Sequence, residues 1–487
     1  MTTSRNCKCN NVSIVEGIFG EVCADNPNDE LENVESVLSS CGEGDHSTGK
    51  ENESIKIKSY TMCNANRMEV KVITWGATIV SIKCPDKYGD TADVVLGFDD
   101  LESYLDPSLN SYIGCILGRC ANRIMDGSFK IKDTDYFLTR NEMDRHHLHG
   151  GVREQKEISS AHIDPHFDSV ALNFHSKPIF AAKKNEHFLS SSSKQQLINC
   201  QTNGFGRRIW ESHLEDGCSV IMSYLSADGD EGYPGAVLVT AKFKLTDDNR
   251  LTIGIRASTS KPTLVNLSHG SLFNLAGHDA GEEELRSHKI TLNCDRWTVS
   301  EFEDPVPTGA IRGVGGTTMD LRIAKTIGES VDKATLGKGF DHNFCVLRNS
   351  QPEVSFVARA LHPKTGRFLE IYSDQPGVQF YTASRLPPYT PATIFPCDDQ
   401  VVDCADPCDC ETESSNAESH VSEKNKLQFL PGKAGAEYKR FCAFGLQPQN
   451  YPNAVNVAKF PCPILRPGQV YYHDLIYKFG VQLCDSL

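Results

Sequence analysis

The 487-residue sequence has no apolar run long enough to cross a membrane as a helix, which would need about 20 consecutive apolar residues. It also lacks an excess of positive charge, because 49 lysines and arginines against 64 aspartates and glutamates leave a net charge of -15. Nucleic acids and anionic membrane surfaces attract basic proteins, so this balance argues against both as partners. The slightly basic start at residues 1–10 is followed by no apolar segment of the kind that a secretory signal has, and we expect a cytoplasmic location.

The chain has 19 cysteines but lacks the features of a disulfide-bonded secreted protein. The cysteine count is odd, the chain is long and no secretory signal is present, so we expect mostly reduced thiols. The densest group of cysteines is not spaced as the paired C-x-x-C arrangement of a zinc site, and it lies among aspartates. This is typical of a solvated acidic loop. Likewise, His342 and His473 have no partners at recognisable ligand spacing. The sequence predicts neither a metal nor a cofactor. The cysteines of the acidic group are Cys397, Cys404, Cys408 and Cys410.

The sequence also lacks long stretches with the 3.6-residue apolar period of a helix. Apolar and polar residues alternate one by one instead. Apolar and polar residues alternate over residues 237–245 and again over 251–257, which predicts a hairpin with one buried face. Residues 354–361 and 368–372 repeat the pattern across a turn that contains proline and glycine. The pattern predicts an all-β fold, a large antiparallel β-sandwich.

Eight short motifs occur in a fixed order over roughly residues 55 to 480, and together they carry a resemblance. They are L-G-R-C-A-N-R-I at 117–124, L-H-G-G at 148–151, D-G-D-E-G-Y-P-G at 228–235, V-N-L-S-H-G-S-L-F-N-L-A-G-H at 265–278, M-D-L-R at 319–322, G-F-D-H-N-F at 339–344, Q-P-G-V-Q-F-Y-T at 375–382 and Q-P-Q-N-Y-P-N-A-V-N at 447–456. The set resembles the galactose mutarotase (aldose 1-epimerase) family, since eight such motifs in order would not arise by chance. The resemblance implies the family's supersandwich of stacked sheets and a role in hexose metabolism.

Three segments have no counterpart in the resemblance. Residues 1–53 are rich in Asn, Glu, Ser and Gly with few large apolar side chains, and we expect a disordered N-terminal extension. The mutarotase-like body is then residues 54–487, interrupted by insertions at about 154–203 and 397–426. Loops tolerate such insertions because the entropy of loop closure grows only slowly with length. The acidic insertions are candidates for contacting a protein partner.

The resemblance implies that part of a sugar site is retained. Asn122 and Arg123 match the family's hydroxyl-binding pair, and His149 matches the histidine of L-H-G-G. Asp320 matches a carboxylate that grips ring hydroxyls, and Gln379 matches the amide of G-V-Q-F. Each of these side chains alone could serve a structural role, but their joint match favours binding of a hexopyranose.

The resemblance also implies that the proton-transfer positions are lost. Opening a hexopyranose at its anomeric carbon requires a base for the O1 proton and an acid for the ring oxygen. Gln447 stands where the family has its glutamate base, and an amide does not take up a proton near neutral pH. Gly270 stands where the family has its histidine acid, while His269 comes one residue earlier and so faces the other side of a strand.

Two functional hypotheses follow. The first is a family member that binds a hexopyranose but is catalytically impaired. The second is an active aldose 1-epimerase that interconverts the α and β anomers of galactose or glucose, in which a bulge turns His269 into the pocket as a substitute acid. We favour the first hypothesis, because a bulge would repair the acid position only and would leave Gln447 without the ability to act as a base.

Overall fold

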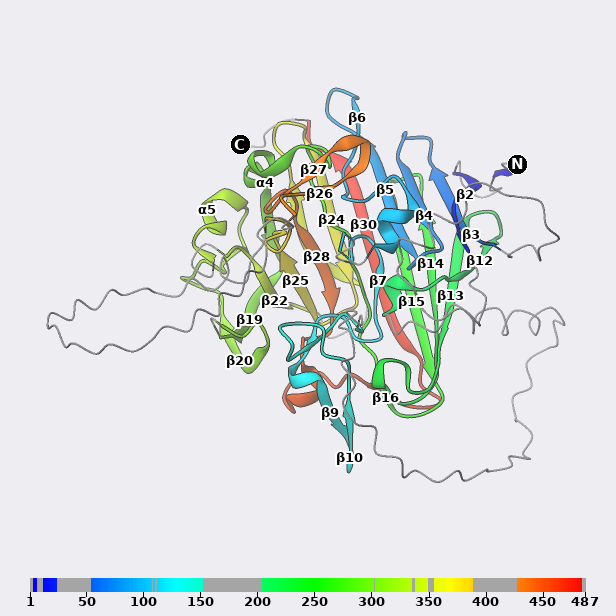
Figure 1. Ribbon diagram of the computed structural model, residues 1–487. Helices are drawn as coiled ribbons and strands as arrows, with labels where there is room; N and C mark the ends of the chain where they lie inside the picture. The colour runs from blue at the N-terminus through cyan, green and yellow to red at the C-terminus, as the bar shows by residue number, and fades with distance from the viewer. Residues whose placement is uncertain are drawn as a thin grey trace, which may run out of the picture.

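The computed structural model describes residues 3–6, 12–23, 54–106, 108–109, 112–151, 204–301, 303–334, 338–348, 354–388 and 427–483. Strands dominate this part of the chain, and helices are short segments between them (Figure 1). The α-helices are α2 Leu101–Leu105, α4 Gly281–Ser287 and α5 Ile327–Val331. Single 3-10 turns occur at η1 Met125–Gly127, η2 Phe205–Arg207, η3 Asp230–Gly232, η6 Lys433–Gly435 and η7 Ala454–Asn456.

The largest layer is a nine-stranded antiparallel sheet. In spatial order its strands are β12 Glu211–Glu215, β13 Ser219–Ser226, β14 Val237–Leu245, β15 Arg250–Thr259, β30 Tyr471–Val481, β24 Arg367–Ser373, β23 Ser355–Leu361, β18 Lys289–Leu292 and β21 Lys325–Thr326. Every second side chain of β14 is buried, and β15 pairs with it from Leu245↔Leu251 to Val237↔Thr259. The first predicted hairpin is therefore confirmed. The second is present as β23 and β24, with a register shift between Phe356 and Ala358.

A six-stranded sheet begins at the N-terminus of the chain. Its strands, in spatial and chain order, are β1 Thr3–Asn6, β2 Ser13–Cys23, β3 Ser54–Cys63, β4 Glu69–Ile73, β5 Thr78–Pro85 and β6 Thr91–Asp93. The prediction that residues 1–53 are disordered is wrong for β2, which pairs with β3 along its whole length. Ile14 of β2 is fully buried whereas Ile18 is 56% exposed. Backbone pairing holds this strand, and its own sequence SIVEGIFGEVC is rich in apolar residues, so the composition averaged over residues 1–53 was misleading. Residues 24–53 lie outside the described residues.

A five-stranded sheet carries several of the predicted site residues. Its strands in spatial order are β20 Pro307–Gly313, β19 Cys294–Ser300, β22 Asp341–Val346, β25 Gly377–Tyr381 and β28 Gly445–Gln449. Short strand pairs close the loops around it. They are β10 Thr134–Phe137 with β9 Ser128–Ile131, β11 His147–Leu148 with β8 Arg123–Ile124, β16 Thr263–Leu264 with β29 Ile464–Leu465, β17 Ser268–His269 with β7 Ile116–Leu117, and β26 Leu430–Pro431 with β27 Glu437–Tyr438.

One continuous cluster of buried apolar side chains joins the three large sheets. Val72 of β4, Phe243 of β14 and Phe380 of β25 all belong to it, and all are fully buried. Because a sheet with one apolar face must bury that face against another layer, the shared cluster makes the three sheets a single body. The prediction of an all-β fold built from antiparallel sheets is confirmed.

The two predicted insertions, at 154–203 and 397–426, lie outside the described residues, and so do the four cysteines of the acidic group. Within the described ranges, no set of three or more His, Cys, Asp or Glu side chains is arranged to hold a metal ion. No helix of the same ranges is long and apolar enough to span a membrane. Cys218 is disulfide-bonded. Eight other cysteines in the described ranges are free thiols: Cys63, Cys84, Cys115, Cys120, Cys294, Cys345, Cys442 and Cys462.

Candidate functional site

Two arginines and two carboxylates form one buried ion-pair network at the start of β22. The Nη2 atom of Arg123 lies 3.1 Å from Oε1 of Glu142 and 3.0 Å from Oδ2 of Asp341. Arg385 also pairs with Oε1 of Glu142, and its Nη2 atom lies 3.5 Å from Oδ2 of Asp341. The Arg123 side chain is 4% exposed and that of Glu142 is 9% exposed. Four segments distant in sequence thus meet in a cluster whose formal charges balance.

Both carboxylates of this network are ionised at neutral pH. Burial alone would raise the pKa of Glu142, but the charges of Arg123 and Arg385 outweigh it and lower the pKa to about 2. Burial acts in the same direction on Asp341, yet the two arginines and the Gln379 amide hold its pKa well below its usual range. The site therefore presents carboxylates that accept hydrogen bonds and that are poor proton acceptors.

Gln379 connects this network to the base position. Its Nε2 atom donates a 2.7 Å hydrogen bond to Oδ1 of Asp341, because Asp341 pairs with Tyr381 and so shares a sheet face with Gln379. Its Oε1 atom is buried and has no hydrogen-bond partner among the described residues. On the other side, Gln379 lies directly opposite Gln447 in the β25–β28 register, and Gln447 is 8% exposed. The structure thus brings the base position beside the predicted sugar-binding amide.

Asn122 and His149 are joined by two hydrogen bonds, one to the His149 ring and one between backbones. The Asn122 N–H donates to Nδ1 of His149 at 3.1 Å, and the His149 N–H donates to the Asn122 carbonyl at 3.1 Å. A Cβ at Gly150 would lie 1.8 Å from the carbonyl oxygen of Gly118, so this close approach requires glycine. Burial, assisted by the charge of Arg123, lowers the pKa of His149 to about 3. The neutral ring accepts at Nδ1 and therefore carries its proton at Nε2, where it can donate.

The acid position is filled by backbone. A Cβ at Gly270 would lie 2.3 Å from the carbonyl oxygen of Tyr112 and 3.4 Å from that of Cys115. The Gly270 N–H donates to the Cys115 carbonyl at 2.8 Å, which holds the two segments together. The Tyr112 ring lies against His149, with 4.9 Å between ring centroids, so Tyr112 itself borders the site. No side chain can occupy position 270 unless this backbone moves.

His269 lies in the core and is fully buried. Its ring packs edge-on against Tyr477 of β30 at a centroid distance of 6.1 Å, and neither ring nitrogen has a hydrogen-bond partner in the described part of the chain. Burial and the nearby His473 lower its pKa to about 3. It sits in the two-residue strand β17, where Ser268 pairs with Leu117 and His269 with Ile116, without a bulge. This position does not fit the role of a substitute acid.

Asp320 is the one predicted binding residue that the structure does not bring to this cluster. Its carboxylate forms a two-point hydrogen bond with the guanidinium of its neighbour Arg322, at 2.9 and 2.8 Å. Within the described residues, no hydrogen bond or ion pair joins Asp320 to the network of Arg123. Asp320 therefore lies apart from this network, and the carboxylate that the structure places beside Gln379 is that of Asp341.

Three members of the network were missed in the sequence. Asp341 lies in the G-F-D-H-N-F motif, two residues before the strand position that pairs with Gln379, so its motif could have identified it. Glu142 and Arg385 belong to none of the eight motifs, and only the fold brings them together.

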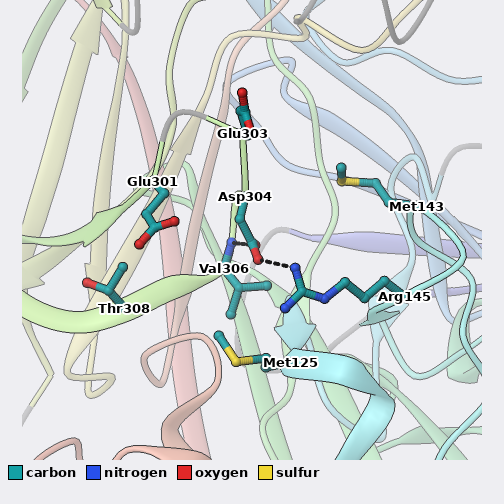
Figure 2. A pocket seen from close by; sticks show the side chains of 8 residues that line it. All are labelled: Met125, Met143, Arg145, Glu301, Glu303, Asp304, Val306 and Thr308. Atoms are coloured by element: carbon teal, nitrogen blue, oxygen red, sulfur yellow. Dashed lines mark hydrogen bonds and ion pairs between the residues drawn. The ribbon is translucent and has the colours of Figure 1, made fainter.

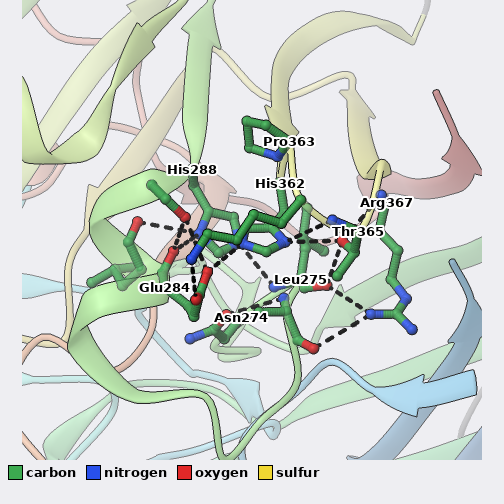
Figure 3. A network of polar contacts seen from close by, with 12 residues as sticks. Asn274, Leu275, Glu284, His288, His362, Pro363, Thr365 and Arg367 are labelled. Carbon is green, nitrogen blue, oxygen red and sulfur yellow. Dashed lines mark hydrogen bonds and ion pairs between the residues drawn. The ribbon is translucent and has the colours of Figure 1, made fainter. Parts of the chain in front are cut away.

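A second polar network supports the segment that carries Gly270 (Figure 3). The Leu275 N–H donates to Nε2 of His288 at 2.9 Å, and Arg367 donates to the Leu275 carbonyl at 3.2 Å. The ring of His288 lies 4.8 Å from that of His362, whose Nε2 is 2.8 Å from Oε2 of Glu284. Helix α4 and the β23–β24 turn therefore fix the backbone that follows the acid position.

A surface pocket of about 630 Å³ contains the ion pair of Arg145 with Asp304, in which Nη1 lies 3.0 Å from Oδ2 (Figure 2). None of the predicted sugar-binding residues lines this pocket. The lining residues are Met125, Met143, Arg145, Glu301, Glu303, Asp304, Val306 and Thr308.

Comparisons with known proteins agree with the motifs. The aldose 1-epimerase family matches residues 58–178 and 193–478. Galactose mutarotase of Homo sapiens is 33% identical over 415 residues, which cover 85% of this chain and 92% of that protein. Galactose mutarotase of Rattus norvegicus is 32% identical over 418 residues, which cover 86% of this chain and 92% of that protein.

A solved structure supports the same fold. The aldose epimerase homologue from C. elegans superposes with a TM-score of 0.61 at 24% identity and covers 86% of this chain and 97% of its own. The predicted galactose mutarotase-like sandwich is thereby confirmed. Together with the match of the family over most of the chain, these likenesses show that the chain belongs to the aldose 1-epimerase family.

Proposed function

We propose that this protein binds a hexopyranose and is impaired in converting one anomer into the other. The observation that carries the proposal is the position of Gln447, directly across from Gln379 and within the site, where an amide replaces the proton acceptor that the reaction requires. The sugar-holding groups are retained around it.

Binding is supported by free donors and acceptors that remain after the network has formed. Oε1 of Gln379 is a buried acceptor without a described partner, and leaving such a group unpaired costs about 1–3 kcal/mol. The Nε2–H of His149 is a donor, and the carboxylate of Asp341 is held in place by Arg123 and Gln379. Sugar hydroxyls donate and accept at once, so a pyranose can satisfy such a mixture of fixed groups.

Impairment is supported at both proton-transfer positions. Gly270 has no side chain, and the carbonyl of Tyr112 fills the space beside it. Loss of a proton-transfer group typically lowers a rate by about 10²-fold to 10⁴-fold. The competing hypothesis, an active epimerase with His269 as its acid, has no supporting contact, because His269 packs in the core without reaching a described polar group.

The test measures binding and turnover on one preparation of the full chain. Calorimetric titration with galactose and with glucose should give binding, while polarimetry at the same protein concentration should show little acceleration of mutarotation. Absence of heat for every common hexose, with the fold intact by circular dichroism, would contradict the binding half of the proposal. Ordinary turnover would contradict the other half.

We further propose a cytoplasmic location and a protein partner that contacts the insertions at 154–203 and 397–426, the second of which is acidic. The net charge of -15 supports a basic contact surface on such a partner. Cell fractionation tests the location. A pull-down with the full chain and with a chain lacking residues 398–425 tests the partner, and equal recovery by both would contradict a role for the second insertion.

A further inference from the structure

The candidate sugar site contains two guanidinium groups, a combination that ordinarily favours anions. Arg123 and Arg385 lie within reach of the same two carboxylate oxygens, Oε1 of Glu142 and Oδ2 of Asp341. Paired arginines recognise carboxylates and phosphates by forked hydrogen bonds. A site with these two residues alone would be expected to take an anionic sugar such as a hexuronate.

The two carboxylates cancel that preference. Each of them forms ion pairs with both arginines, and the four side chains together carry two positive and two negative charges. Asp341 belongs to the sugar-holding strand, since it also accepts from Gln379. The Glu142 carboxylate differs, because it accepts hydrogen bonds from Arg123 and Arg385. Glu142 is therefore the carboxylate whose side-chain contacts neutralise the two arginines.

Exposure indicates which guanidinium Glu142 restrains. The Arg385 side chain is 25% exposed whereas that of Arg123 is 4% exposed, so Arg385 is the arginine nearer to solvent. An anion that enters the site would meet Arg385 first. It would also meet the charges of Glu142 and Asp341, which repel it strongly in a partly buried site.

We propose that Glu142 is a selectivity residue with Arg385 as its counterion, and that this pair makes the sugar site reject anionic sugars in favour of uncharged hexopyranoses. The inference rests on the proposed hexose binding, and it adds a residue pair that decides between substrate classes. Removing the carboxylate leaves one guanidinium charge unmatched, whereas removing both members of the pair restores the balance.

The experiment titrates galactose and galacturonate at pH 7 into the full chain and into Glu142→Gln and Glu142→Gln/Arg385→Gln variants. The parent should bind galacturonate at least about tenfold more weakly than galactose. Glu142→Gln should shift the ratio of the two dissociation constants by about tenfold or more toward galacturonate, which corresponds to about 1.4 kcal/mol. The double variant should return to a ratio close to that of the parent.

Glu282→Gln is the matched control, because Glu282 forms an exposed ion pair with Arg286 on α4 and its loss changes the net charge by the same amount. This variant should leave the ratio unchanged, and thermal unfolding should show that each variant is folded. Equal parent affinity for the two sugars, or an unchanged ratio in Glu142→Gln, would overturn the inference. If galactose binds neither the parent nor any variant, the proposed function fails. The selectivity inference is then still decided by galacturonate: a gain of galacturonate binding in Glu142→Gln supports it, and no gain overturns it.

Discussion

The backbone carbonyl of Tyr112 occupies the space that a side chain at Gly270 would need, 2.3 Å from the place of a Cβ atom. The loss of the acid that we propose would therefore involve more than the substitution of one side chain, since the backbone of the neighbouring loop occupies its position. Restoration of histidine at 270 would require the Tyr112 segment to move.

The first prediction concerns Gly270→Ala. The added methyl group should force the Tyr112 and Cys115 backbones apart, because overpacking a close contact typically costs about 1–3 kcal/mol. Chemical denaturation should show a loss of stability of this size. Gly217→Ser serves as a comparison for the stability loss when a side chain is added where there is room, since a Cβ at Gly217 meets no atom within 4 Å. The positive φ of 65° at Gly217 adds strain of its own. Unchanged stability of Gly270→Ala would show that the Tyr112 segment moves aside at no measurable cost in free energy.

The second prediction concerns His269→Leu. A buried imidazole whose two nitrogens find no hydrogen-bond partner among the described residues carries a desolvation cost that leucine lacks, so the variant should be more stable at pH 7 by about 1 kcal/mol or more. Sugar affinity should not change. A loss of hexose binding in this variant would instead favour the hypothesis that His269 acts in the site.

The same variant tests the pH dependence of stability. The pKa of His269 is lowered from 6.5 to about 3, so between these values the unfolded chain binds a proton that the folded chain does not. Stability should be unaffected by this group above pH 6.5 and should fall as the pH drops toward 3. His269→Leu should reduce that slope by up to about 1.4 kcal/mol per pH unit. An identical slope in parent and variant would contradict the buried, neutral state of His269.

The third prediction separates the two aspartates. Asp341→Asn should weaken galactose binding by about 1.5–3 kcal/mol, because it removes a charged acceptor held by Arg123 and Gln379. Asp320→Asn should leave the affinity for galactose unchanged, since that carboxylate pairs with Arg322. Calorimetric titration of both variants checks this assignment. The reverse result would return the sugar-binding role to Asp320.

The fourth prediction concerns Gln447→Glu. A carboxylate at this position restores a base while the acid stays absent. When two catalytic groups work as a unit, restoring one of them alone raises the rate only slightly. Mutarotation should remain far below that of an intact family enzyme, although the sugar is still bound. If this single change produced ordinary turnover, another group in the site would have to be supplying the acid.

The sequence predicted the parts of the molecule that depend on local pattern. Alternation at 237–257 predicted the β14–β15 hairpin because each buried side chain there contributes its own signal. The strand β2 was missed because the composition was taken over all of residues 1–53, although residues 13–23 are themselves rich in apolar side chains. Their pairing with β3 is a contact with a later part of the chain, which no local pattern records.

The site divides in the same way. Arg123, His149 and Gln379 lie in motifs and are brought together by the fold, whereas Asp320 also lies in a motif but points to a local arginine. Glu142 and Arg385 are 243 residues apart and meet only through the tertiary structure. The carbonyl of Tyr112 beside Gly270 is likewise a tertiary contact that no local pattern records.

Polarimetric mutarotation of α-D-galactose with the unmodified full chain is the decisive test of the proposal that both proton-transfer positions of the site are lost. We expect the protein at micromolar concentration to change the relaxation rate little beyond that of buffer, while it still binds the sugar. A turnover number in the ordinary enzyme range of about 1–10³ per second would show that the protein is an active epimerase.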